Sequence, residues 1–379
     1  MSMKRLYLLL AAVFCVSVST AHAAAFYNLD QSASAVGVAN AFTATASDPS
    51  AMFYNPAGLA WQEGVGAMVS GAARYQNQSV VLPGGKAPNT ASPNSLASLY
   101  VGWMPKDSNW GIGFGAFSPY SLNSEWGNVF GGQGQLTKFD TPHVALDVVY
   151  ALSSTMAVAV GGDWYTGKLD VNSATTTFHG KDNTGFGGHV SWMWHPRPTW
   201  SVGALYRSRT NMKMSGTATG AVSGTAHVNM NLPDMVRIGV AHDVYDNIKV
   251  EFDGSWTNWS RLSDMNVVGT TTALHTLNLR NTFSAMAGVT WTWRENTQFR
   301  FGYAFDEGAS RKTGMSARVA DNSGHRLTLG AGGDLFGLHM DLAYAYTFYT
   351  NHAVTASTPY NGTYRDRRQS LAFSLSNMF

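Results

Sequence analysis

The stretch LHMDLAYAYTF, residues 338 to 348, alternates large apolar residues with small or polar ones along its whole length. Successive side chains of a β-strand point to opposite faces, so this segment presents one apolar face and one face of small and polar groups. IKVEFDGSW (248–256), TQFRFGYAF (297–305) and LAFSLSNMF (371–379) repeat the pattern. The chain is therefore expected to consist of β-strands with one uniformly apolar face.

The composition indicates where that apolar face lies. Only 13% of the residues are charged, against about 25% in average globular chains. Aromatic residues make up 12%, and there are 39 glycines. Soluble half-buried strands also alternate, but so many alternating segments in a chain this poor in charge are typical of a transmembrane β-barrel. We expect an all-β fold, an antiparallel barrel whose apolar face contacts lipid.

The first 23 residues predict secretion. Lys4 and Arg5 precede an apolar run from Leu6 to Val18, and Ala21-His22-Ala23 is a suitable cleavage site, which together are typical of a signal peptide. Cys15, the only cysteine, lies in that run. Loss of Lys4 and Arg5 reduces the 25 basic residues to 23, equal to the 23 acidic ones. This neutral balance argues against a nucleic-acid partner. Together, the signal peptide and the barrel pattern predict that the protein lies in the bacterial outer membrane.

The alternating segments predict about fourteen strands over residues 64–379. Their connections alternate between tight turns, such as PKDSN, LSST and RENT, and long segments, such as 78–95, 123–135, 260–277 and 351–368. Outer-membrane barrels have an even strand count, short periplasmic turns and long extracellular loops. Both chain ends are then expected on the periplasmic side. The terminal Phe379 resembles the C-terminal signature of such barrels, which implies the barrel-assembly machinery as a partner, with outer-membrane lipid as the surroundings.

Residues 24–63 precede the first strand and predict a plug, or hatch. The stretch ASDPSAMFYNPAGLA (46–60) is nearly uncharged and contains two turn-forming pairs, Asp48-Pro49 and Asn55-Pro56. A barrel of fourteen strands encloses a lumen too wide for its own side chains to fill. A compact segment of small residues would close it. The alternative is that Asn55-Pro56 only forms a turn before the first strand.

The segment AAFYNLDQSASAVGVANAFTATASDPSAMFYNPAGLA resembles the hatch of the FadL family, outer-membrane transporters of long-chain fatty acids and other hydrophobic compounds. Asn55-Pro56-Ala57 matches the NPA signature of that family. WGIGFGAFSPYSLNSEW (110–126) is similar to its third strand, which has a kink and a lateral opening, and FDGSWTNWSRL (252–262) and RFGYAFDEG (300–308) resemble later strands. The resemblance implies hatch or gating roles for Phe26, Asn55, Pro56 and Ala57.

The third strand also predicts a break on physical grounds. Glycine weakens strands and proline removes a ladder donor, so we expect interrupted pairing near Phe117 to Tyr120. The residues assigned to the lateral opening are Gly113, Gly115, Phe117, Ser118, Pro119 and Tyr120.

Ligand contacts are expected on the lumenal face. The resemblance to the FadL family implies that Phe26 lies near the ligand, and we expect it beside apolar lumenal residues such as Met68 and Leu205. By strand phase, Arg74, Arg207 and Arg209 also face the lumen, and an arginine can hold a carboxylate through paired hydrogen bonds. One of these three arginines should therefore contact the head group if the substrate is a fatty acid.

The remaining function classes find little support. The histidines are scattered, with no catalytic or metal-binding spacing, so we expect no enzyme activity, no metal and no cofactor. The predicted function is passive uptake of hydrophobic molecules, with lumenal binding and lateral release. The alternatives are a general diffusion porin for small polar solutes and a structural or adhesion barrel.

Overall fold

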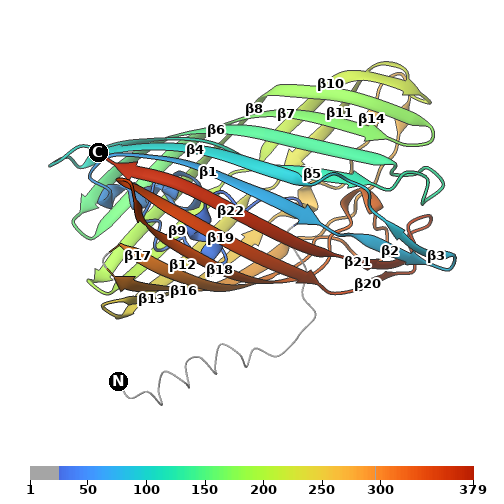
Figure 1. Cartoon of the computed structure of the whole chain (residues 1–379). Helices are drawn as coiled ribbons and strands as arrows, with labels where there is room; N and C mark the ends of the chain where they lie inside the picture. The colour runs from blue at the N-terminus through green and yellow to red at the C-terminus, as the bar shows by residue number, and fades with distance from the viewer. Residues whose placement is uncertain (1–24, 295) are drawn as a thin grey trace.

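The computed structural model describes residues 25–294 and 296–379, so the predicted signal peptide lies outside the described residues. Antiparallel strands form a closed barrel of 14 strands (Figure 1), as the alternation and the turns predict. Strand β1 pairs with both β4 and the last strand, β22, which closes the barrel. The barrel strands are β1 (Gly64–Gln76), β4 (Asn94–Met104), β5 (Trp110–Glu125), β6 (Leu136–Ser153), β7 (Met156–Asn172), β8 (Thr176–Arg197), β9 (Trp200–Arg207), β10 (Thr210–Gly220), β11 (Gly224–Leu232), β12 (Met235–Tyr245), β13 (Ile248–Thr257), β16 (Thr282–Arg294), β17 (Thr297–Asp306), β18 (Gly324–Leu335), β19 (Leu338–Tyr349) and β22 (Arg367–Met378).

Two barrel strands are interrupted. β9 and β10 both pair with β8, one after the other, and together form one strand of the barrel. β11 and β12 form the next strand in the same way, pairing with β10 and β9.

Side-chain burial follows the predicted alternation. On β19, Leu342, Tyr344 and Phe348 are exposed on the outer face, while Ala343 and Ala345 are buried. The outer face is thus apolar, and the inner face carries small residues that let other chain segments approach.

The two ends of the barrel differ. Tight turns and the C-terminus lie at one end, and a small four-stranded sheet lies beyond the other (Figure 1). This sheet and the other short loop elements belong to the long connections; they are β2 (Ser79–Leu82), β3 (Gly85–Pro88), β20 (His352–Val354), β21 (Gly362–Arg365), β14 (Val267–Val268), β15 (Thr272–Ala273), η2 (Trp259–Arg261) and η3 (Ala317–Val319).

The described N-terminal segment, residues 25–62, packs inside the barrel. Its elements are α2 (Ala33–Gly37), α3 (Ala51–Tyr54) and η1 (Pro56–Trp61), and most of its residues are buried. Ser32 caps α2 by accepting a hydrogen bond from Ala35 N, and Asn55 caps η1 by accepting one from Ala57 N. α2 contacts β17, β18, β19 and β22, whereas η1 contacts β4 to β8 on the other side of the barrel. The segment therefore spans the lumen, and its role as a movable hatch stays a prediction.

Side chains of the barrel wall hold this segment through its backbone. Asp253 Oδ2 accepts from the N–H groups of Phe42 and Thr43 at 3.0 and 2.9 Å, and Glu251 Oε1 accepts from Ala44 N at 2.6 Å. A Cβ atom at Gly203 would overlap the carbonyl oxygen of Thr43. Glycine at this wall position is what allows the close approach.

Candidate functional site: a gap between β4 and β5

The hydrogen-bonded ladder between β4 and β5 is incomplete. Pairing runs from Trp103 with Ile112 to Leu99 with Ala116 and ends there. On the other side of β5, the register with β6 shifts between Phe117 and Tyr120. Ser118 and Pro119 therefore form a bulge, as expected where glycine and proline weaken a strand. The predicted interruption at Phe117 to Tyr120 is confirmed; its use as a lateral opening stays a prediction.

The N-terminal segment pairs with the free edge of β5. Tyr27 and Tyr120 form an antiparallel bridge. Asn28 N donates to the carbonyl oxygen of Pro119 at 2.7 Å, and Ser121 N donates to that of Phe26 at 3.2 Å. The segment thus takes the place that β4 leaves empty.

A hollow of about 480 Å³ lies beside the bulge. Leu99 and Trp164 line it and are 41% and 43% exposed, so it opens on the outer face of the barrel. Ser98, Phe117 and His143 also line it but are buried. These three residues form the floor that separates the hollow from the lumen.

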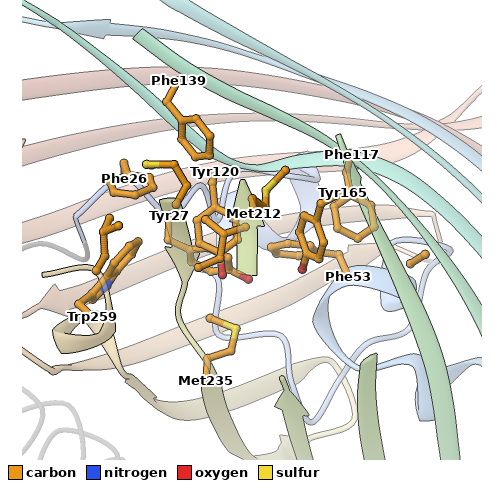
Figure 2. Close-up of a cluster of buried hydrophobic side chains, with 14 of the residues drawn as sticks. Phe26, Tyr27, Phe53, Phe117, Tyr120, Phe139, Tyr165, Met212, Met235 and Trp259 are labelled. Atoms are coloured by element: carbon orange, nitrogen blue, oxygen red, sulfur yellow. The ribbon is translucent and has the colours of Figure 1, made fainter. Parts of the chain in front are cut away.

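Behind this floor, a row of aromatic rings crosses the lumen (Figure 2). Trp259 and Phe26 lie at one end, with ring centroids 4.7 Å apart. From Phe26 the row continues through Tyr120, Tyr27 and Phe53 to Phe117. The centroid distances are 6.1 Å for Phe26–Tyr120, 5.1 Å for Tyr27–Tyr120, 6.0 Å for Tyr27–Phe53 and 5.1 Å for Phe53–Phe117. Met212 and Met235 lie beside the row (Figure 2), and flexible thioether side chains adapt readily to a guest. An apolar path thus leads from Phe26 to the floor of the hollow.

A buried polar cluster supports the floor. Asp163 lies within hydrogen-bond distance of His143 Nε2 at 2.7 Å and His189 Nδ1 at 3.0 Å, and it forms an ion pair with Arg207. The ring of Phe117 packs edge-on against His143, with centroids 4.5 Å apart. Because Arg207 already forms an ion pair with Asp163, it does not fit the expected role of holding a ligand carboxylate.

The other two candidate arginines lie in different surroundings. Arg209 is exposed, so its predicted lumenal orientation is wrong. The break between β9 and β10 shifts the phase, since Arg207 and Thr210 are the buried residues on either side of it. Arg74 is half-buried, and its guanidinium donates to Asn28 Oδ1. Its Nη2 also donates to Ser121 Oγ at 3.4 Å. Asp30, whose charge acts on Arg74, is ion-paired with Arg326 instead, at 2.6 Å.

Arg74 borders a polar cavity of about 70 Å³, which Phe26 and Arg368 also line. Two loop carboxyls, Asp321 and Asp366, are also part of the lining. Burial raises the pKa of Asp321 to about 8 and that of Asp366 to about 6. Near pH 7 Asp321 is therefore mostly neutral, whereas Asp366 stays mostly ionised. The three arginines of the lining, Arg74, Arg318 and Arg368, still outnumber the ionised carboxyls and give the cavity a net positive charge.

The remaining predicted residues are all buried or close-packed. Asn55 Nδ2 donates to Thr43 O at 2.8 Å and to Trp192 O of β8 at 3.1 Å. Ala57 N donates to Ser191 Oγ at 3.0 Å, and Pro56 is the first residue of η1. Gly113 and Gly115 lie against Met52 of α3. Met68 belongs to the same buried cluster as Phe26, whereas Leu205 is buried outside it.

Two residues at the gap were missed from the sequence. Asn28 and Gln31 both donate to the carbonyl oxygen of Ser118, at 3.2 and 3.0 Å. Polar residues inside a plug segment carry no periodic signal, and their partners depend on how the segment sits in the barrel.

Within residues 25–294 and 296–379, no helix is long and apolar enough to cross a membrane. The same described residues contain no group of three or more His, Cys, Asp or Glu side chains placed to hold a metal ion.

Comparison with known proteins places the chain in a family. Residues 13–377 match the family model described as outer membrane protein transport protein (OMPP1/FadL/TodX). The outer membrane protein P1 of Haemophilus influenzae is 23% identical over 334 residues, which cover 75% of this chain and 70% of that protein. A FadL homologue from Pseudomonas aeruginosa has a similar structure, with a TM-score of 0.85 at 16% identity over 94% of this chain and 100% of that chain. The toluene transporter TodX of Pseudomonas putida gives 0.76 at 16% identity, covering 93% and 99%. The chain therefore belongs to the OMPP1/FadL/TodX family of outer-membrane transport proteins.

Proposed function

We propose that this protein takes up hydrophobic molecules passively and releases them sideways into the membrane through the gap between β4 and β5. The observation that carries the proposal is the break in pairing at Ser118 and Pro119, beside an apolar hollow on the outer face. An apolar solute gains roughly 0.8 kcal/mol per buried CH₂ group in lipid relative to water. Sideways release therefore avoids the step into the aqueous periplasm.

The lumenal site is the aromatic row between Phe26 and Phe117. Its rings are buried and packed against one another, so a guest enters by displacing side chains, and the neighbouring methionines adjust to guests of different shape. Long-chain fatty acids suit this site if Arg74 binds the carboxylate in the adjoining cavity. A neutral hydrocarbon, such as the toluene for which TodX is named, requires only the aromatic row.

The N-terminal segment acts as the hatch, with Phe26 at the ligand and Asn55 to Ala57 anchoring it to β8. The filled lumen argues against the alternative of a general diffusion porin, which needs an open aqueous path. Outer-membrane lipid covers the apolar outer face, and the barrel-assembly machinery recognises the C-terminal Phe379.

The test is a tryptophan at the hollow. Ser118→Trp fills the hollow beside the bulge and should slow uptake of a hydrophobic compound while the barrel stays folded. Ala331→Trp, on the exposed face of β18, is the matched control and should leave uptake unchanged. Normal uptake by Ser118→Trp, with the hollow filled, would refute release through this gap.

A further inference from the structure

A row of lysines crosses the outward face of four neighbouring strands, β6, β7, β8 and β10 (Figure 1). Its members are all exposed; they are Lys138, Lys168, Lys181 and Lys213. Lys168 of β7 is directly opposite Lys181 of β8 in the strand register. Lys138 of β6 and Lys213 of β10 follow on either side at diagonal positions, which lie about 7–8 Å apart on one face of a sheet. The row therefore presents four ammonium groups over three strand spacings, about 15 Å.

The chain does not neutralise this row. Among the described residues, none of the four lysines forms an ion pair. Of the nearest carboxyls, Asp170 is ion-paired with His179 at 2.7 Å, and Asp182 accepts from the backbone N–H groups of Thr184 and Lys213. Like charges directly opposite each other destabilise a sheet. The pairing of Lys168 with Lys181 therefore favours a negatively charged partner from outside the chain.

The positive charge is also concentrated here. After residue 23 the chain has equal numbers of basic and acidic residues, yet four of its eight lysines belong to this row. Arg209, exposed on the same side of Lys213 as the tight turns, adds a fifth cation. Only Asp140, Asp170 and Asp182 oppose these five. The patch is thus positive on a protein that is otherwise neutral.

The row lies just beyond the apolar part of the outer face, at the loop end of the barrel. Trp164 and Phe186 are exposed and paired with each other on β7 and β8, and exposed tryptophans of membrane proteins lie at the interface with water. Lys168 follows Trp164 by four residues, about 13 Å along the strand, or ~10 Å of height at the usual barrel tilt. The head groups of a bilayer begin within this distance of its hydrocarbon. In outer-membrane barrels the loop end is extracellular, so the lysines reach the head groups of the outer leaflet.

A hollow of about 450 Å³ adjoins the row at Lys213. The side chains of Ser215, Thr225, His227 and Thr270 also line it, and it opens on the outer face because Lys213, Ser215 and Thr225 are exposed. β14 pairs with β11 beside it. Hydroxyl and imidazole groups both donate and accept hydrogen bonds, which is what the hydroxyls of a sugar require.

We propose that the lysine row and the hollow beside it bind the phosphorylated sugar head group of an outer-leaflet glycolipid. Phosphate oxygens accept charge-assisted hydrogen bonds from ammonium groups, and the hollow receives the sugar. The ligand is a lipid rather than a free sugar phosphate, because its acyl chains then cover the exposed rings of Trp164 and Phe186 directly below the row. This surface lies outside the lumen, so the inference does not depend on the proposed uptake.

Native mass spectrometry of the purified full-length protein tests the site, with lipid A that carries two phosphates as the probe. Each lysine at an anionic lipid surface contributes about 1 kcal/mol. Lys168→Gln combined with Lys181→Gln should therefore weaken binding of lipid A about 30-fold, equivalent to ~2 kcal/mol. Lys86→Gln combined with Lys312→Gln, at exposed lysines of other loops, removes the same charge and should bind lipid A like the unmodified protein.

Two further comparisons use the same assay. Asp140 is opposite Lys168, so Asp140→Asn removes a competing carboxylate and should strengthen binding. Inorganic phosphate at the concentration of lipid A should not displace the lipid; displacement would assign the row to the free ion and overturn the lipid as its ligand.

Equal binding of lipid A by the Lys168 and Lys181 double variant and by the unmodified protein would overturn the proposal. Equal binding of lipid A and of its dephosphorylated form would do the same, because the acyl chains alone would then hold the lipid. The double variant should take up hydrophobic compounds at the normal rate, so loss of lipid A binding and loss of transport are separate results.

Discussion

Replacing Asn55 by alanine removes the side chain that joins the N-terminal segment to β8. Asn55 is fully buried and donates to Thr43 O within the segment and to Trp192 O on the wall. Ala57 N loses its cap but keeps Ser191 Oγ as acceptor. The main loss is therefore the donor shared by the two carbonyl oxygens.

A buried acceptor deprived of its donor costs about 1–3 kcal/mol. This cost applies only while the N-terminal segment lies inside the barrel, because water solvates the carbonyl oxygens of Thr43 and Trp192 once the segment is displaced. The population of displaced segment should therefore rise roughly 5- to 150-fold. The wall strands keep their ladder bonds, so the barrel itself should stay folded.

Single-channel recording in planar bilayers measures this directly. Asn55→Ala should show openings roughly 5 to 150 times as frequent as those of the unmodified protein, or should take up hydrophobic compounds more slowly. Migration of unheated samples on gels checks that the barrel is folded, and Asn211→Ala, at an exposed asparagine on β10, is the matched control. Unchanged conductance together with unchanged uptake would refute the anchoring role and leave Asn55-Pro56 as an ordinary turn.

Three further predictions follow from particular contacts. Gly203→Ala should displace the N-terminal segment, because the added Cβ overlaps Thr43 O; bilayer conductance should rise, and an unchanged conductance would contradict the close approach. Asp321 accepts from the N–H groups of Ala25 and Ala309, and burial raises its pKa to about 8. The contribution of Asp321 to stability is therefore fully present below about pH 4 and is lost as the pH rises through about 8. Protection of the Ala25 amide against hydrogen exchange measures this contribution. Asp321→Asn should abolish the pH dependence of that protection, and an unchanged pH profile in this variant would show that Asp321 is not its source. Arg74→Gln should weaken binding of a long-chain carboxylic acid about tenfold or more in calorimetry and spare a hydrocarbon of similar length; equal losses would show that Arg74 does not hold the carboxylate.

The barrel could be predicted from the sequence because each strand carries its own signal. Outward side chains are apolar and inward ones face the packed lumen, so the alternation persists through segments such as 338–348. Connection lengths then give the strand order without any knowledge of distant contacts. The interruption at Ser118 and Pro119 was equally local, since it depends on the backbone chemistry of those residues.

The site was harder to predict because it depends on how the N-terminal segment sits in the barrel. Counting alternate residues places Arg209 on the lumenal face, but the break after Arg207 invalidates that count. Asn28 and Gln31 gave no signal at all, because an amide in a plug segment has no preferred partner until β5 and the plug are placed together. Contacts between segments far apart in the sequence are thus where the prediction failed.

Hydrophobic molecules are proposed to leave through the gap between β4 and β5. A photoreactive hydrophobic ligand, activated during uptake and mapped by mass spectrometry, tests it most directly. If the molecules leave by this route, adducts should form on residues of the hollow, such as Phe117, Ser118 and Trp164. Adducts confined to the cavity at the tight-turn end of the barrel, which Asp48 and Asn377 line, would contradict it, because the ligand would then pass the N-terminal segment towards the periplasm.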